Sequence, residues 1–83
     1  MDTIKTGSYL AALRKNAGMT QQEAADRLGV SNKTISKWES GGGFPDIAIL
    51  PALAELYGVT ADDILAGETV RGSTGGRQVE QYL

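Results

Sequence analysis

Apolar residues recur every three or four positions along most of the chain, and glycines separate the stretches in which they do so. This spacing predicts short amphipathic helices, and no stretch shows the apolar–polar alternation of a strand. The first predicted helix starts at Gly7 or Ser8 and ends at Asn16. Its inward-facing residues are Leu10 and Leu13. Four helices should end in the left-handed turn that glycine accepts, at Gly18, Gly29, Gly58 and Gly67.

The second and third predicted helices carry recognisable start signals. Thr20 and Glu23 form a capping box, in which each side chain bonds to the backbone N–H of the other residue. Ser31 is a favourable N-cap residue for the third helix, which ends near Ser40. Both helices are therefore expected to have well-defined N-termini.

The fourth predicted helix has two possible starts. Asp46 can cap a helix that begins directly after Pro45, and Pro51 then removes one hydrogen bond and kinks the first turn. The other possibility is that the regular helix starts near Pro51. The apolar residues at helical spacing are Ile47, Leu50, Leu53, Ala54 and Tyr57. Thr60 caps a short fifth helix, in which Asp63 stands where glutamate would complete a capping box.

These elements predict an all-α fold, a compact domain of five helices over residues 1–67. Residues 68–83 are expected to form a flexible linker or tail, because residues 68–77 are polar and rich in glycine. Three apolar residues at helical spacing follow, Val79, Tyr82 and Leu83. They fit either the start of a further segment, in a chain cut from a longer protein, or a frayed natural terminus.

The third predicted helix has two unlike faces. Its apolar residues Ile35 and Trp38 point away from a polar arc of about 140°. The residues of that arc are Asn32, Lys33, Ser36 and Lys37. A solvated face usually carries paired charges of both signs, whereas this one offers only amide, hydroxyl and amine groups. The pattern indicates a binding surface, with Trp38 in the core and not stacked on a base.

Composition excludes several classes of protein. The 83 residues suffice for one small domain, and the chain contains neither cysteine nor histidine. Disulfides, thiolate metal sites and histidine-based acid–base chemistry are therefore absent, which argues against an enzyme. Asp62 and Asp63 fit the first turn of a helix better than a metal site, since no third ligand follows. We expect no metal, cofactor or small-molecule ligand.

The charges are unevenly distributed along the chain. The formal net charge is −2, but six basic and four acidic residues up to Pro45 give +2, while two basic and six acidic residues beyond it give −4. The positive half contains the third helix. Because no apolar run approaches the ~20 residues that span a bilayer and no secretory signal opens the chain, we expect a cytoplasmic protein.

Residues 21–40 have the spacing of two helices that cross at a tight turn. Ala25 is small enough for close helix crossing, and Gly29 supplies the positive φ of the turn. Five apolar residues fix the crossing angle by packing, namely Ala24, Leu28, Val30, Ile35 and Trp38.

With this spacing, the segments "LRKNAGMTQQEAADRLGVSNKTISKWESG" and "LPALAELYGVTADDIL" resemble the phage-repressor-like helix-turn-helix family, which includes the lambda, 434 and Xre repressors. The resemblance covers residues 4–66, with the helix-turn-helix motif at 21–40. It implies sequence-specific binding of double-stranded DNA by a transcriptional regulator, of the repressor type. It also implies a homodimer on an operator whose half-sites lie about one helical turn, ~34 Å, apart.

The resemblance assigns roles to individual residues. The polar face of the third helix would lie in the major groove, where amides, hydroxyls and lysines can read base edges. The implied base contacts are Asn32, Lys33, Ser36 and Lys37. The implied phosphate or flanking contacts are Gln21, Gln22, Ser31, Thr34 and Ser40. Arg14 and Glu39 would form a structural ion pair that ties the third helix to the first.

The loop "SGGGFP" departs from the family pattern, in which relatives often carry lysine or arginine over the phosphates. Fewer phosphate contacts weaken binding, so we expect modest affinity from a monomer and dependence on dimerisation. The acidic second half leaves an alternative function, a protein-interaction module such as an antitoxin that binds a toxin partner. In that case DNA binding would be secondary or lost.

Overall fold

The computed structural model describes residues 2–70, and this part of the chain forms five helices and no strand, which confirms the predicted all-α class. In order, the helices are α1 (Thr3–Asn16), α2 (Gln21–Leu28), α3 (Asn32–Glu39), α4 (Leu50–Tyr57) and α5 (Ala61–Ala66). Residue 1 and residues 71–83 lie outside the described residues, and with them most of the predicted linker or tail.

The predicted start of α1 was wrong by about one turn. Asp2 caps the helix, since its carboxylate accepts hydrogen bonds from the N–H groups of Ile4 and Lys5 at 3.0 and 3.1 Å. Gly7, which the sequence placed at the helix start, lies inside α1 and is buried. Leu10 is buried as predicted, whereas Leu13 is only partly buried.

The predicted caps of α2 and α3 are confirmed. The Thr20 N–H donates to Glu23 Oε1 at 2.8 Å, and the Glu23 N–H donates to Thr20 Oγ1 at 3.0 Å, which completes the capping box. Ser31 Oγ accepts the Thr34 N–H at 3.2 Å at the start of α3. The turn between the two helices uses Gly29 with a φ of 72°.

Of the two possible starts of α4, the structure shows the later one, and Asp46 does not cap the helix. The cap residue of α4 is Ile49, which makes no side-chain cap, and Pro51 lies in the first turn, where a missing N–H costs nothing. Asp46 instead accepts the Ile49 N–H through its backbone carbonyl at 2.9 Å, in the turn before the helix. Ile47 therefore leaves the apolar face of the helix and is 84% exposed.

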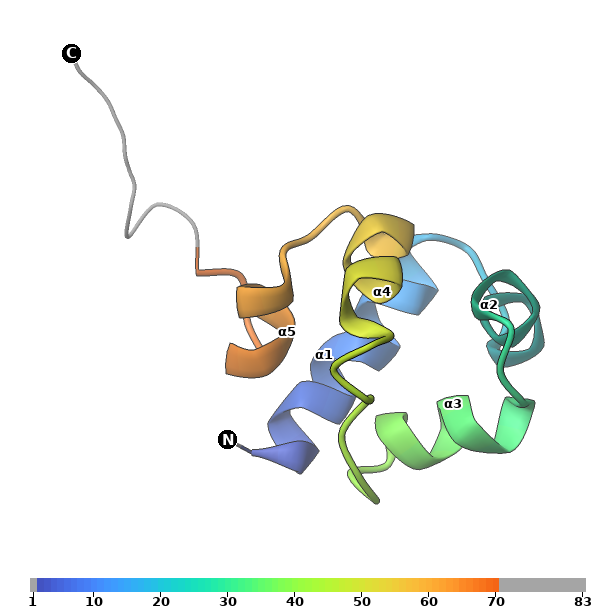
Figure 1. Cartoon of the computed structure of the whole chain (residues 1–83), viewed down its shortest axis with the longest axis horizontal. Coiled ribbons are helices and arrows are strands. Elements are labelled where there is room, and N and C mark those ends of the chain that lie inside the picture. Colours follow the sequence, from blue (N-terminus) through green and yellow to red (C-terminus); the bar gives the residue numbers. More distant parts are fainter. Residues whose placement is uncertain (1, 71–83) are drawn as a thin grey trace, which may run out of the picture.

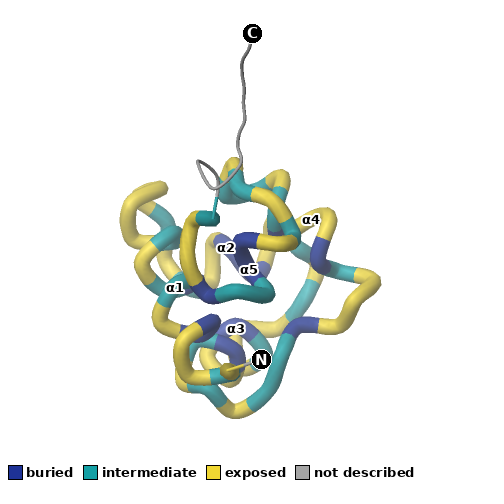
Figure 2. Tube along the Cα trace, turned by 90° about the vertical axis from the view of Figure 1, so that its left-hand side faces the viewer, coloured by how far each residue is buried: buried dark blue, intermediate teal, exposed yellow. Residues whose placement is uncertain are grey.

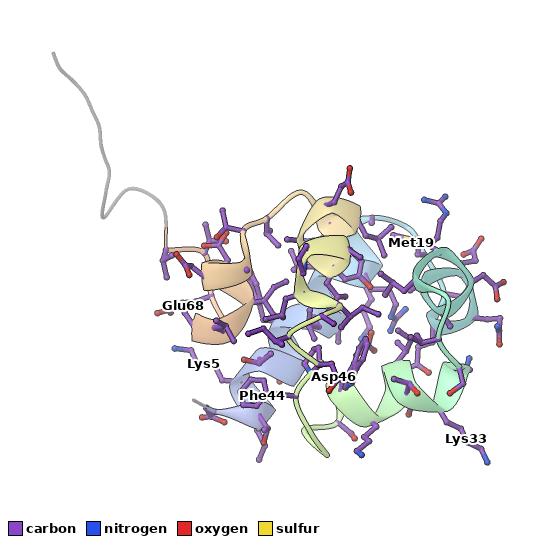
Figure 3. All side chains as sticks on the ribbon, in the orientation of Figure 1. Lys5, Met19, Lys33, Phe44, Asp46 and Glu68 are labelled. Carbon is purple, nitrogen blue, oxygen red and sulfur yellow. The ribbon has the colours of Figure 1, made fainter. Side chains whose placement is uncertain are left out.

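The residues after α5 contact the rest of the domain as far as the structure describes them. Thr60 and Asp63 form the predicted capping box of α5. The Val70 N–H donates to the other carboxylate oxygen of Asp63 at 2.9 Å. Lys5 pairs with Glu68 at 3.4 Å (Figure 3), so the first residues of the predicted linker are bound to α1 and α5.

The helices surround one hydrophobic core. Figure 1 shows α2 and α3 at one end of the molecule and α5 at the other, with α1 and α4 between them. In Figure 2, the buried parts of the trace turn toward the interior that the helices enclose. The buried apolar residues are Leu10, Ala24, Ala25, Ile35, Trp38, Leu50, Leu53 and Ile64. None of the helices between residues 2 and 70 is both long and apolar enough to cross a membrane.

Candidate nucleic-acid interface

One face of α3 is buried and fixes how the helix is held. Ile35 and Trp38 are only 2% and 8% exposed and pack in the core. α3 contacts both α1 and α2. Trp38 is thus a core residue, as the sequence predicted. Because α3 is anchored along this face, its opposite face has a defined orientation.

The opposite face of α3 offers polar side chains to solvent. The residues concerned are those predicted to contact bases, Asn32, Lys33, Ser36 and Lys37, and all four are exposed. Lys33 extends away from the protein at the start of the helix (Figure 3). Among residues 2–70, no hydrogen bond or ion pair involves the side chain of any of these four residues. Their donors and acceptors are therefore available to a partner.

The predicted flanking residues differ, because their side chains are held by the protein itself. Ser31 Oγ lies 3.0 Å from Thr34 Oγ1, and Ser40 Oγ donates to the Lys37 carbonyl at 3.1 Å. Gln22 donates to Asp26 at 2.9 Å within α2. The site thus combines a free centre with a rim of fixed polar groups.

Glu39 connects three parts of the fold next to this face. Arg14 donates to both oxygens of the Glu39 carboxylate, at 2.7 and 3.0 Å, and to the Met19 carbonyl at 2.8 Å. Gln21 donates to the same carboxylate at 3.1 Å. The Arg14 and Glu39 side chains are 11% and 8% exposed, so this is a largely buried ion pair.

The ion pair also fixes the charge state of Arg14. The hydrogen bonds to Glu39 raise the pKa of Arg14 above its ordinary value, although burial acts in the opposite direction. The pair ties the C-terminal end of α3 to α1. The sequence comparison predicted this pair, but it did not predict the hydrogen bond that Gln21 adds.

Two features of the site were missed from the sequence. Gly7 of α1 lies so close to the end of α3 that a Cβ atom on it would meet the carbonyl oxygens of Trp38 and Glu39. Gly42 and Gly43 lie against the side chain of Lys37. The available signals were a glycine inside a predicted helical stretch and a run of three glycines directly after the third helix.

Between residues 2 and 70, no group of three acidic residues is arranged to hold a metal ion. Asp63 is used for the cap of α5 and for binding the backbone of Val70.

Comparison with known proteins identifies this architecture. A family model described as Helix-turn-helix (HTH_3) matches residues 10–64, which include α2, α3 and the turn between them. The chain belongs to this helix-turn-helix family. The predicted resemblance to phage-repressor-like regulators is thereby confirmed.

Several members of the family are similar to this chain over most of its length. It is 42% identical over 59 residues to the HTH-type transcriptional activator BcrR of Enterococcus faecalis, covering 71% of this chain and 29% of that protein. It is 38% identical over 67 residues to the HTH-type transcriptional regulator ImmR of Bacillus subtilis, covering 81% of this chain and 53% of that protein. The chain thus spans only part of the length of these relatives.

A solved helix-turn-helix structure is similar in both fold and sequence. The P22 c2 repressor protein, solved in complex with a synthetic operator, superposes with a TM-score of 0.72 at 32% sequence identity. The match covers 76% of this chain and 96% of that one. This supports the prediction of a lambda-repressor-like fold.

Proposed function

We propose that the chain is the DNA-binding part of a bacterial or phage transcriptional regulator, which binds double-stranded DNA sequence-specifically and catalyses no reaction. The observation that carries this proposal is the two-sided α3. Its inner face is buried at Ile35 and Trp38, and its outer face presents four polar side chains that have no hydrogen-bond or ion-pair partner within the described part of the chain. Such a regulator would act in the cytoplasm, where the DNA of a bacterium lies.

The outer face of α3 has the chemistry that major-groove recognition requires. An α-helix fits the major groove, where an amide can pair with adenine and lysine can donate to the acceptors of guanine. Asn32, Lys33 and Lys37 supply these groups, and the Ser36 hydroxyl can bond to several bases. We assign base reading to these four residues.

Gln21 is suited to a phosphate contact at the edge of the groove. It is the first residue of α2, and the N-terminus of a helix favours an anion. Its amide nitrogen uses one of two hydrogens to reach Glu39, which leaves the second for a phosphate oxygen. The residues at the rim, Gln22, Ser31, Thr34 and Ser40, would add flanking contacts.

Two copies of the chain would bind together. Each α3 carries only two lysines on its outer face, so one copy makes few charge-based contacts with phosphates. A homodimer doubles these contacts and matches an operator with two-fold symmetry. The half-sites should lie one helical turn, ~34 Å, apart.

Selection of bound duplexes from a random DNA pool tests the proposal. We expect one family of sequences to be enriched and bound better than bulk DNA at low salt. Failure of every selected duplex to bind better than bulk DNA would contradict the proposal. A fluorescence titration of the selected duplex then supplies the reference affinity for variants.

Two variants separate base reading from phosphate binding. Lys37→Ala should reduce discrimination at one or two base pairs by about 1–3 kcal/mol, whereas Gln21→Ala should weaken binding to all duplexes alike. Lys15→Ala removes an exposed lysine that lies on α1 and not on α3, and serves as the matched control.

The alternative function, binding of a protein partner such as a toxin, makes a different prediction for the same surface. Chemical-shift changes on addition of duplex DNA should map to Gln21 and to the outer face of α3 if DNA is the partner. A protein partner should instead perturb the acidic part of the chain beyond Asp46, with little response to DNA.

A further inference from the structure

The loop after α3 contains three successive glycines whose backbones have different requirements. Gly41 has a φ of 85°, in the left-handed region that favours glycine. Gly42 and Gly43 lie outside that region, so their backbone angles do not require glycine. The reason for glycine at these two positions must be sought in what surrounds them.

The neighbour of both glycines is Lys37. A Cβ atom on Gly42 would lie 3.1 Å from Lys37 Cγ and 3.3 Å from the Lys37 carbonyl oxygen. A Cβ atom on Gly43 would lie 3.1 Å from Lys37 Cε and 3.8 Å from its Nζ. The distances to Cγ and Cε are shorter than the ~3.5–4.0 Å of a favourable carbon–carbon contact. The Lys37 side chain therefore runs along the two glycines from its stem to its amine.

The backbone of this loop is held in register with Lys37. The Gly42 N–H and the Ser40 hydroxyl both donate to the Lys37 carbonyl, at 2.8 and 3.1 Å. These bonds fix the start of the loop against the last turn of α3. The backbone of Gly42 and Gly43 beside the Lys37 stem is thus part of the folded domain.

We propose that Gly42 and Gly43 are positioning residues for Lys37. Because neither carries a Cβ atom, the lysine stem can lie against the loop backbone, in the direction in which its amine meets a base edge. The inference rests on the proposed function, since it deepens the role of Lys37 in reading DNA. A free lysine stem has four rotatable bonds, and restricting them before binding reduces the entropy that binding must remove. Lys33 extends away from the protein, and its side chain contacts neither of these glycines.

The glycine loop would influence the preference between DNA sequences through Lys37. None of Gly41, Gly42 and Gly43 carries a side chain that could bind DNA. A positively charged loop would strengthen binding to any sequence, because phosphates carry no sequence information. A loop that orients a base-reading lysine acts on the preference between sequences.

A double-mutant cycle with Gly43→Ala and Lys37→Ala tests the inference. Gly43→Ala is chosen because its methyl group would meet only the flexible end of Lys37, so the thermal unfolding midpoint should be almost unchanged. The measured quantity is the preference for the selected duplex over a duplex altered at the base pairs that depend on Lys37. We expect Gly43→Ala to reduce this preference by about 2- to 10-fold, and to have no further effect when Lys37 is already alanine.

An NMR experiment on the free protein provides a readout that does not depend on DNA. The contact predicts a nuclear Overhauser effect between the Gly43 Hα protons and the Lys37 Hε protons, and a change in the Lys37 Hε shift in Gly43→Ala. Ala48→Ser, at an exposed position later in the same loop, is the control and should leave both the Lys37 signals and the sequence preference unchanged.

Each outcome decides the inference. An equal effect of Gly43→Ala with and without Lys37 would mean that the glycine meets DNA directly, and would overturn it. The same holds if Gly43→Ala keeps the full sequence preference, or if the free protein shows no contact between the two residues. A wild type that binds no duplex selectively would contradict the proposed function as well. Equal preference for the selected duplex in wild type and Gly43→Ala would contradict the inference alone.

Discussion

Gly7 is the residue at which α1 crosses the end of α3. A Cβ atom there would lie 2.4 Å from the Trp38 carbonyl oxygen and 2.8 Å from that of Glu39. Both atoms belong to the backbone, so a methyl group can be accommodated only if the two helices move apart. The position therefore favours glycine for steric reasons, although glycine lowers the stability of a helix by about 1 kcal/mol relative to alanine.

We therefore expect Gly7→Ala to destabilise the domain by about 1–3 kcal/mol, because overpacking outweighs the gain in helix propensity. Urea unfolding followed by circular dichroism measures the difference. Ser8→Ala, at the next and exposed position of α1, is the matched control and should change stability by less than about 0.5 kcal/mol. A stabilised Gly7→Ala variant would show that the crossing is looser than described.

Tyr57 links stability to alkaline pH. Burial raises the pKa of its hydroxyl above the ordinary value, and the negative charge of Glu39 adds to the effect while Arg14 opposes it. The folded state thus favours the neutral phenol. Its stabilising contribution is complete below the unfolded tyrosine pKa of ~10 and is lost as the pH rises through the higher folded pKa.

Tyr57→Phe should consequently lose less stability than the wild type between about pH 9 and pH 11. Urea unfolding at several pH values measures the free energy of unfolding for both proteins. If the two curves run parallel over this range, Tyr57 does not contribute to the alkaline loss of stability.

At the level of single residues, the sequence predicted what depends on near neighbours in the chain. The capping boxes of Thr20 and Thr60 require only a partner three residues later, and both are present. The close approach of Gly7 depends on atoms of α3 about thirty positions away. The role of Gly42 depends on the conformation of the Lys37 side chain, which a run of glycines does not reveal.

At the level of helices, the ion pair between Arg14 and Glu39 joins α1 to α3, and Gln21 adds α2 to the same carboxylate. A largely buried pair contributes little net stability compared with apolar residues, but removal of one partner leaves a buried charge. The pair is therefore expected to matter most for the orientation of α3.

Glu39→Gln should destabilise the domain by about 3–5 kcal/mol, since it leaves Arg14 charged and without its counter-charge. Glu68→Gln is the matched control, because it breaks the exposed pair with Lys5 and should cost no more than about 1 kcal/mol. Urea unfolding of both variants at neutral pH measures the contrast. Equal effects would mean that the Arg14 pair is as well solvated as the Lys5 pair.

The N-terminus of α4 shows where helix prediction from sequence reaches its limit. The segment from Asp46 to Pro51 contains two plausible starts, and each satisfies a local rule. Tertiary packing selects the later one, with Leu50 and Leu53 in the core and Ile47 exposed. The helix-turn-helix segment left no such choice, because Gly29, two caps and the apolar spacing all agree.

At the level of the whole molecule, the balance of charge limits how strongly it can bind DNA. The formal net charge is −2, and two cations are paired with carboxylates within residues 2–70. Arg14 is paired with Glu39, and Lys5 with Glu68. The cations that the proposed interface offers are Lys33 and Lys37, so a dimer brings four of them to the DNA.

The salt dependence of binding should reflect this number. Each neutralised phosphate contributes about −0.9 to the slope of log K against log salt. A lysine that reads a base edge also lowers the charge of nearby phosphates, by at most one phosphate each, so the slope should be no steeper than about −3.6 for a dimer and about −1.8 for a monomer. Lys33→Gln should make the dimer slope shallower by up to about 1.8, since it removes one cation from each copy. Lys5→Gln should leave it unchanged, because Lys5 lies on α1 and pairs with Glu68. Fluorescence anisotropy at four or more salt concentrations measures the slope.

A much steeper slope that does not respond to Lys33→Gln would contradict this prediction. It would mean that cations outside α3, such as Lys15 or Arg27, make the phosphate contacts. Another face of the molecule would then approach the DNA.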